Sequence, residues 1–175
     1  MGGALKTALI AAATSAAANA AVAAPAALLG KSVVVSWSET RIQRIVGEAN
    51  WRTVNASHEL SVYVSSVGRV FSKFSATTRR GTGANEQVSG QGGNRVPSFS
   101  GRTMTIVALQ QGIARRVGVE FDESFSNCTA SVIRGKSGAG SGFAKSIING
   151  QRIEIQSAST GSASCCVRAG NVFGN

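Results

Sequence analysis

Residues 60–77 read LSVYVSSVGRVFSKFSAT, and this stretch decides the fold class. Leu60, Val62 and Val64 occupy every second position before a short turn at 65–69, and a second run rich in β-branched and aromatic residues follows at 70–77. A period of two is typical of half-buried strands, and a glycine-bearing turn between two such runs indicates a hairpin. The stretch therefore predicts two antiparallel strands joined by a tight turn.

Strand-like runs of this kind recur along the chain from residue 31 onward, and β-branched residues are concentrated in them. The runs lie at 33–38, 60–65, 70–77, 104–109, 114–121, 128–134, 151–157 and 163–167. Short links at 110–112, 122–127 and 158–162 join neighbouring runs, which favours hairpin order. We therefore predict an all-β fold, an antiparallel up-and-down meander of about eight strands, closed as a lipocalin-like barrel or folded as a sandwich.

The inward-facing side of these runs supplies the predicted core. Its members are Val33, Val35, Trp37, Leu60, Val62, Val64, Val70, Phe74, Val107, Val117, Val119, Phe121, Val132, Ile153 and Ile155. One segment, TRIQRIVGEA at 40–49, departs from the period of two, because Ile42, Ile45 and Val46 have helical spacing. We expect one short helix there, closing an end of the barrel, although Gly47 weakens the pattern.

The first 26 residues, MGGALKTALIAAATSAAANAAVAAPA, have the composition of an export signal. Lys6 supplies the charged start, an alanine-rich apolar run follows, and either Ala18-Asn19-Ala20 or Ala24-Pro25-Ala26 offers a small-x-small cleavage site. The apolar run is too short and too rich in alanine to span a membrane. We therefore expect residues 1–26 to be a secretory signal peptide, with no transmembrane segment after its cleavage and a periplasmic or secreted protein as the product.

Residues 27–175 are expected to form a single β domain, because a chain of about 150 residues can bury one ordinary core. Two glycine-rich stretches interrupt the strand pattern, at 79–102 and at 136–150. A loop of roughly two dozen residues without structure of its own is either a functional lid or disordered. The polar composition of 79–102 favours disorder.

The three cysteines carry the most specific chemistry in the sequence. In an oxidising compartment one pair should form a disulfide, and an odd count leaves one thiol free. Cys165 and Cys166 are adjacent in a strand and so face opposite ways, and Cys165 shares its face with Val167 while Cys128 shares a face with Val132. We therefore predict a structural disulfide between Cys128 and Cys165, and the role of Cys166 stays open.

The chain offers little material for catalysis or metal binding. His58 is its only histidine and stands beside Glu59 just before a strand, so we interpret His58 as a surface or turn residue. Asp122 and Glu123 point to opposite faces of an extended chain, which leaves them to cap a hairpin turn rather than to act as an acid pair. The cysteine and histidine spacings match no zinc pattern, and the glycine-rich stretches match no nucleotide-binding fingerprint. We expect no enzyme activity, no metal and no cofactor.

The chain is strongly basic, with 18 Lys and Arg residues against 8 Asp and Glu residues and a formal net charge of +10. A balance of this kind favours association with anionic partners, such as a small ligand or a charged surface. Nucleic acid is a poor candidate, because an exported protein rarely meets it and several aromatic residues occupy inward positions instead of exposed stacking platforms. The candidate anion-binding residues are Arg41, Arg44, Arg52, Arg79, Arg80, Arg115 and Arg116.

Three runs, GKSVVVSWSETR at 30–41, LSVYVSSVGRVF at 60–71 and FDESFSNCTASVIRGK at 121–136, together with IEIQSAS at 153–159 and Cys165, resemble small uncharacterised exported proteins of bacteria. The resemblance spans nearly the whole chain after residue 26, and it implies no functional residue. The order of hairpins is also similar to that of calycin barrels, the lipocalin-like architecture. That second likeness concerns the architecture, and a fold does not by itself define a function.

Together these observations predict a non-enzymatic binding protein of the cell envelope or extracellular space, expected to be a monomer. A barrel mouth or the glycine-rich loops would hold an anionic ligand, because small barrels can hold a ligand at one end. Two other classes stay open. One is a hydrolase or protease inhibitor whose site escapes recognition, with His58 and Glu59 as its nameable residues. The other is a charged envelope protein that binds anionic surfaces without specificity and releases them in modest salt.

Overall fold

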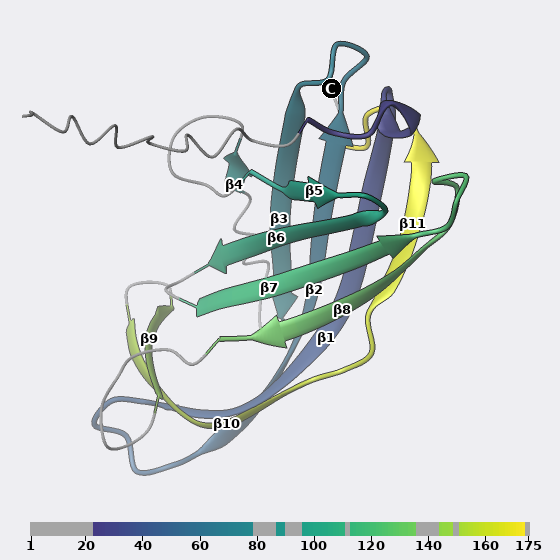
Figure 1. Cartoon of the computed structure of the whole chain (residues 1–175). Coiled ribbons are helices and arrows are strands. Elements are labelled where there is room, and N and C mark those ends of the chain that lie inside the picture. The colour runs from purple at the N-terminus through teal and green to yellow at the C-terminus, as the bar shows by residue number, and fades with distance from the viewer. Residues whose placement is uncertain are drawn as a thin grey trace, which may run out of the picture.

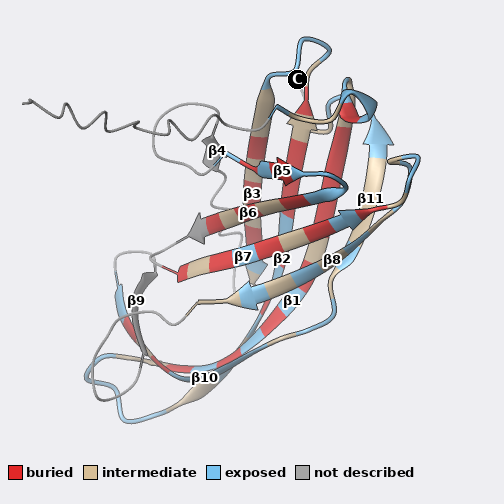
Figure 2. Ribbon diagram, in the orientation of Figure 1, coloured by how far each residue is buried: buried red, intermediate tan, exposed pale blue. Residues whose placement is uncertain are grey.

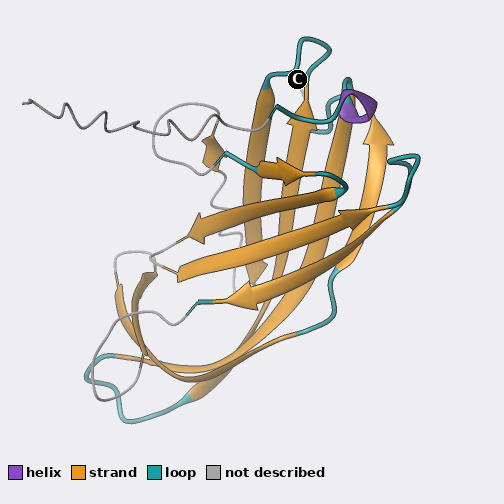
Figure 3. Ribbon diagram, in the orientation of Figure 1, coloured by secondary structure: helices purple, strands orange, loops and turns teal. Residues whose placement is uncertain are grey.

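The computed structural model describes residues 23–78, 87–89, 96–110, 113–135, 144–148 and 151–173, and antiparallel strands make up most of them (Figure 3). In chain order the elements are the 3-10 helix η1 (Ala26–Leu28) and the strands β1 (Lys31–Ile45), β2 (Arg52–Val64), β3 (Val70–Thr78), β4 (Gln87–Ser89), β5 (Ser98–Ser100), β6 (Thr103–Gln110), β7 (Ile113–Phe121), β8 (Cys128–Arg134), β9 (Ala144–Ile148), β10 (Gln151–Thr160) and β11 (Ser164–Ala169). The fold is all-β, as predicted. Within the described segments, no helix has the length and apolar character needed to cross a membrane.

The larger of two sheets is built around β1. Its strand order is β4-β3-β2-β1-β10-β9, and β11 also pairs with β1. The turn at 65–69 closes the β2–β3 hairpin with a hydrogen bond from the Ser65 N–H to the Arg69 carbonyl (2.8 Å). Gly68 adopts a φ of 79° in this turn, which glycine does without steric cost. The hairpin predicted at 60–77 is therefore confirmed.

The smaller sheet, β5-β6-β7-β8, packs across part of the larger sheet with its strands at a steep angle to β1, β2 and β3 (Figure 1). In the described residues no ladder joins the two sheets and no barrel is closed, an arrangement consistent with either predicted architecture, barrel or sandwich. Alternate residues of the facing strands are buried between the sheets (Figure 2). Beyond the smaller sheet, β1, β2 and β10 continue and curve together as an extension of the larger one (Figure 1).

Most of the predicted core residues are buried between the sheets, which confirms the direction in which most strands face. Val70 and Val132 are only half-buried but still pack against the core. In β6 the prediction is wrong by one residue, because Met104 and Ile106 are buried and Val107 lies on the opposite face. This strand is apolar on both faces, so the period of two could not select between them.

β10 and β11 do not pair with each other, so the hairpin predicted across 158–162 is wrong. Both strands run antiparallel to β1, with Thr160 opposite Glu39 and Ser164 opposite Ser36. Residues 161–163 therefore oppose residues 37–38, which defines a β-bulge rather than a turn. Gly161 permits the close approach, since a Cβ at this position would lie 2.5 Å from the Ser38 hydroxyl. β10 and β11 thus run in the same direction and pair one after the other with β1.

The helix predicted at 40–49 is absent, because residues 40–45 belong to β1. Arg41 and Gln43 are buried while Thr40 and Ile42 are exposed, so the strand keeps its period of two. Its inner face is polar here, which reverses the usual pattern. Because the inward positions 41 and 43 are polar, the apolar residues at 42, 45 and 46 do not follow a period of two, and their spacing resembles that of a helix.

The two glycine-rich stretches are not plain loops throughout, contrary to expectation. β4 and β5 lie within 79–102, and β9 lies within 136–150. Each of these short strands pairs with a longer neighbour: β4 with β3, β5 with β6 and β9 with β10. Residues 79–86, 90–95, 136–143 and 149–150 lie outside the described residues.

The folded domain begins earlier in the chain than the predicted boundary at residue 27. Ala24 packs against the core, and Leu28 is fully buried in it. The Leu28 N–H donates to the Pro25 carbonyl (2.9 Å), which shapes the short helix η1. Residues 1–22, which contain most of the predicted signal peptide, lie outside the described residues.

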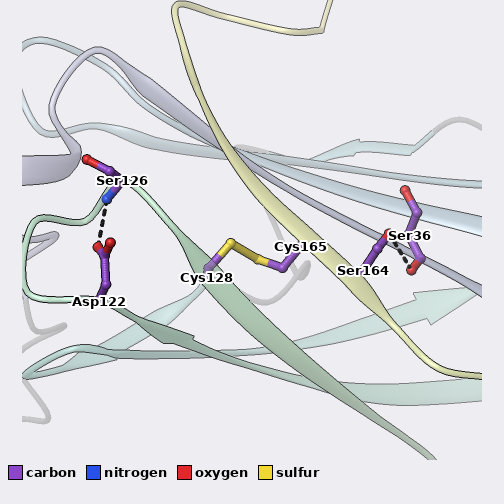
Figure 4. The surroundings of a disulfide bond; sticks show 6 residues. All are labelled: Ser36, Asp122, Ser126, Cys128, Ser164 and Cys165. Atoms are coloured by element: carbon purple, nitrogen blue, oxygen red, sulfur yellow. Dashed lines mark hydrogen bonds between the residues drawn. A yellow bond between two sulfur atoms is a disulfide. The ribbon is translucent and has the colours of Figure 1, made fainter.

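The predicted disulfide is present. Cys128, at the start of β8, is bonded to Cys165 in β11, and their Cα atoms are 5.5 Å apart (Figure 4). The bond links the smaller sheet to the larger one. Cys166 is a free, half-buried cysteine on the next position of β11.

Asp122 organises the turn between β7 and β8. It accepts hydrogen bonds from the Asn127 side chain (2.9 Å) and from the Ser126 N–H (2.8 Å; Figure 4). These bonds stabilise the carboxylate and lower the pKa of Asp122 to about 2. The turn-capping role predicted for Asp122 is confirmed, whereas Glu123 is exposed and lies near Arg102 (3.7 Å).

Candidate anion-binding site

Charged residues are buried where the inner face of β1 changes from apolar to polar. After Trp37, the inward positions of this strand are Glu39, Arg41 and Gln43, and all three are buried. His58 on β2, Arg115 on β7 and Arg134 on β8 meet them from the other strands. We call these six residues the buried cationic cluster. It lies between the main apolar core and a smaller apolar group around Ile113, Ile153 and Ile155.

Glu39 is the centre of the cluster and joins the two sheets. Arg115 donates its Nε to one carboxylate oxygen of Glu39 and its Nη2 to the other (2.8 Å for the second bond). Both side chains are 1% exposed or less, so the pair is shielded from water. Burial alone would raise the pKa of Glu39, but the contacts with His58 and Arg115 and the positive charge of Arg115 hold it well below its usual range. Glu39 is therefore ionised throughout the neutral range.

His58 is buried in this cluster, so its interpretation as a surface or turn residue is wrong. Its ring is stacked between Trp37 and Phe74, with centroid distances of 5.3 Å and 5.6 Å, and its Nε2 lies 3.4 Å from Glu39. Burial lowers the pKa of His58 from 6.5, which makes the ring neutral at pH 7. Glu59 is exposed on the opposite face of β2, so the two residues cannot act as a pair.

Positive charge exceeds negative charge in the cluster. The guanidinium groups of Arg41, Arg115 and Arg134 face the single carboxylate of Glu39, which leaves two net positive charges while His58 is neutral. Arg115 and Arg134 are direct cross-strand partners, an arrangement of like charges that destabilises a sheet. Burial lowers the pKa of both Arg41 and Arg134; the charge of Glu39 opposes this effect, and the charge of Arg115 adds to it.

Several polar atoms of the cluster and of the adjacent Trp37 are buried without a hydrogen-bond partner in the described residues. The donors are Trp37 Nε1, Arg41 Nε, Arg134 Nε and Arg134 Nη2, and the two nitrogens of His58 and Gln43 Oε1 are also unpaired. Arg134 Nε lies 3.8 Å from Glu39, too far for a hydrogen bond. Buried polar groups are almost always hydrogen-bonded, so this accumulation of unpaired donors indicates a site for an acceptor.

The other acidic residues of the described chain are placed elsewhere. Glu48 pairs with Arg52 (2.9 Å) and Glu154 pairs with Arg44 (2.7 Å). In the described part of the chain Glu39 is the one carboxylate whose charge supports Arg41 and Arg134. Among all 8 Asp and Glu residues only Glu86 lies outside the described residues.

The seven arginines predicted to bind an anion do not form one group. Arg41 and Arg115 belong to the cluster, and Arg115 is already bonded to Glu39. Arg44 stacks on Trp51 at 4.5 Å besides pairing with Glu154. Arg52 pairs with Glu48, Arg116 is exposed on β7, and Arg79 and Arg80 lie outside the described residues.

Sequence reasoning missed Glu39, Gln43, His58 and Arg134 as members of the site. A signal was available in β1, where Glu39, Arg41 and Gln43 recur at every second position directly after the inward Trp37. The partners on β7 and β8 could be found only from the register that places Arg115 opposite Arg134.

A second concavity, of about 450 Å³, lies on the outer face of β1, β2 and β3. Small hydroxylated side chains line it, among them Ser38, Ser57 and Thr77. These three residues alternate with the inward ones, and Trp37 and His58, from the neighbouring positions, also border the concavity.

Comparison of the chain with protein-family models, with curated proteins and with solved structures gave no match. The function is therefore argued from the residues of the cluster.

Proposed function

We propose that this chain is an exported, non-enzymatic binding protein whose buried cationic cluster holds an anionic ligand. The observation that carries the proposal is the imbalance at the cluster. The guanidinium groups of two buried arginines and of the half-buried Arg134 face one carboxylate, and buried donor atoms on Arg41 and Arg134 have no hydrogen-bond partner in the described residues. An anion at this position would supply both the missing charge and the missing acceptors.

The energetics favour a ligand over an empty cluster. A buried ion that lacks a partner costs several kcal/mol, because the interior cannot replace its hydration. Removal of an unneutralised arginine should therefore stabilise the unliganded protein, whereas removal of a purely structural arginine should destabilise it. Natural proteins retain such locally unfavourable groups chiefly where function requires them.

The chemistry of the cluster gives no comparable support for catalysis. In the described part of the chain the side chains found against the His58 ring are Trp37, Phe74 and Glu39, and none of these is a nucleophile activated by a base. Export is supported by the composition of residues 1–26 and by the Cys128–Cys165 disulfide, which is compatible with an oxidising compartment.

The proposal is tested by anion-dependent stability. Thermal unfolding of the protein is followed by circular dichroism with increasing sulfate or acetate at constant ionic strength. A ligand that binds only the folded state raises stability, by about 2.7 kcal/mol at a hundred times its Kd. We expect such a rise for the native chain and a much smaller one for Arg41→Gln, which should also be as stable as the native chain or more so without anion.

Arg116→Gln is the matched control, because Arg116 is an exposed arginine beside Arg115. It should keep the full response. An equal loss of response in both variants, or a response that vanishes at modest salt for every protein, would identify nonspecific surface association instead. His58→Ala tests the enzyme alternative, since a binding protein has no turnover to lose.

A further inference from the structure

We propose, on the basis of the function above, that the group held by the buried cationic cluster is a doubly charged tetrahedral oxyanion, a phosphate or sulfate group, rather than a carboxylate. The charge of the cluster favours a dianion. The cluster has two net positive charges while His58 is neutral, and a carboxylate would neutralise only one of them. A dianion of phosphate type compensates both.

Arg134 has a free guanidinium edge. Nε and Nη2 form one planar edge of a guanidinium group and together fit two oxygens of a carboxylate or phosphate. Arg115 uses this same pair of atoms to hold Glu39. In Arg134, its cross-strand neighbour, both atoms are buried without a hydrogen-bond partner. One arginine of the pair is therefore occupied by the chain's own carboxylate, and the other presents an equivalent vacant edge.

The unpaired arginine donors come from both sheets. Arg41 Nε is also buried and unpaired, and it comes from β1 in the opposite sheet. A planar carboxylate that fills the Arg134 edge directs both of its oxygens into that plane. A tetrahedral group has further oxygens outside the plane, which can accept from a donor on the facing sheet. The ligand therefore bridges the two sheets, as Glu39 does beside it.

The experiment is titration calorimetry of the native chain with sulfate, inorganic phosphate, phenyl phosphate and acetate at one ionic strength and about pH 8, where both phosphates are mostly dianions. We expect the three doubly charged anions to bind at least about tenfold more tightly than acetate, as expected for an additional charge-assisted hydrogen bond. A preference between inorganic phosphate and phenyl phosphate supports the proposal either way, and it identifies the source of the group as a free ion or a monoester.

Arg134→Lys keeps the charge but removes the two-atom edge, so it should weaken sulfate binding about tenfold while circular dichroism stays native. Arg116→Lys is the matched control and should bind sulfate as the native chain does. Acetate binding as tightly as sulfate would overturn the oxyanion class but leave anion binding intact. Equal affinities of Arg134→Lys and Arg116→Lys would overturn the role of Arg134.

If no anion binds and Glu86→Gln destabilises the chain strongly, the chain itself supplies the missing charge, and both this inference and the proposed function fail.

Discussion

Glu39→Gln isolates the central charge of the cluster with almost no change in shape. It removes the carboxylate that neutralises Arg115 and leaves a guanidinium that is 1% exposed without a counter-charge. Removal of one partner from a buried ion pair costs about 3–5 kcal/mol. Small domains have total stabilities of roughly 5–15 kcal/mol, so the variant should lose about a fifth or more of its free energy of unfolding.

Urea unfolding followed by circular dichroism measures this loss, and an unchanged m-value would show that the folded state keeps its compactness. Glu48→Gln is the control, because the Glu48–Arg52 pair is exposed and its loss should cost no more than about 0.5 kcal/mol. A double variant, Glu39→Gln with Arg115→Met, removes both charges of the buried pair and should recover most of the loss. Equal effects of Glu39→Gln and Glu48→Gln would refute the buried bidentate pair.

The same variants also separate stability from binding. Glu39→Gln increases the net charge of the cluster by one, whereas the double variant restores the native value. Stabilisation by added sulfate should therefore be largest in Glu39→Gln and similar in the native chain and the double variant. Equal stabilisation of all three proteins by sulfate would mean that sulfate binding does not depend on the charge of the cluster.

Three further predictions concern protonation, the disulfide and processing. The free energy of unfolding should fall as the pH drops below about 6.5, by up to about 1.4 kcal/mol per pH unit, because the buried His58, the only histidine, takes up a proton less readily than it does in the unfolded chain. His58→Gln should flatten this slope in urea titrations between about pH 5 and pH 8. Loss of the Cys128–Cys165 bond, which spans a sequence separation of 37, should lower the free energy of unfolding by about 3–4 kcal/mol in urea titrations of the double alanine variant. When reductant breaks this bond in the native chain, the difference in stability between the two proteins should disappear. Intact mass of the exported protein should place cleavage after Ala20, because cleavage after residue 26 would remove a packed part of the core, and a mature chain that starts at residue 27 would contradict this.

The strands and the disulfide could be predicted because they depend on local alternation. In the stretch 60–77 the apolar residues have one periodicity and one turn, so face and register follow together. The facing of Cys128 and Cys165 follows from the same argument, and the bond confirms it. The order of the last strands could not be predicted in this way, because a bulge at Gly161 and a hairpin turn have similar glycine- and serine-rich sequences.

The alternation of apolar residues predicted the core but could not predict the candidate site. Alternation assigns apolar residues to the interior, so Ile42 was interpreted with Ile45 and Val46 as part of a short helix, whereas in the structure Ile42 is exposed on a strand and Arg41 is buried. His58 could not be placed by local sequence either. Its burial depends on Trp37 and Phe74 on two other strands and on the charge of Glu39, none of which is adjacent to it in the chain.

The pairing of β1 with the end of the chain has a consequence for the order of folding. Residues 31–45 leave the ribosome or a transport channel early, but one of their two hydrogen-bonding edges is completed only by residues 151–169. Until those residues arrive, a long row of backbone N–H and C=O groups is open to pairing with other chains, and contacts of such large sequence separation form slowly. Completion of this edge also brings Cys165 to Cys128, so oxidation of the pair should report when the aggregation-prone interval ends.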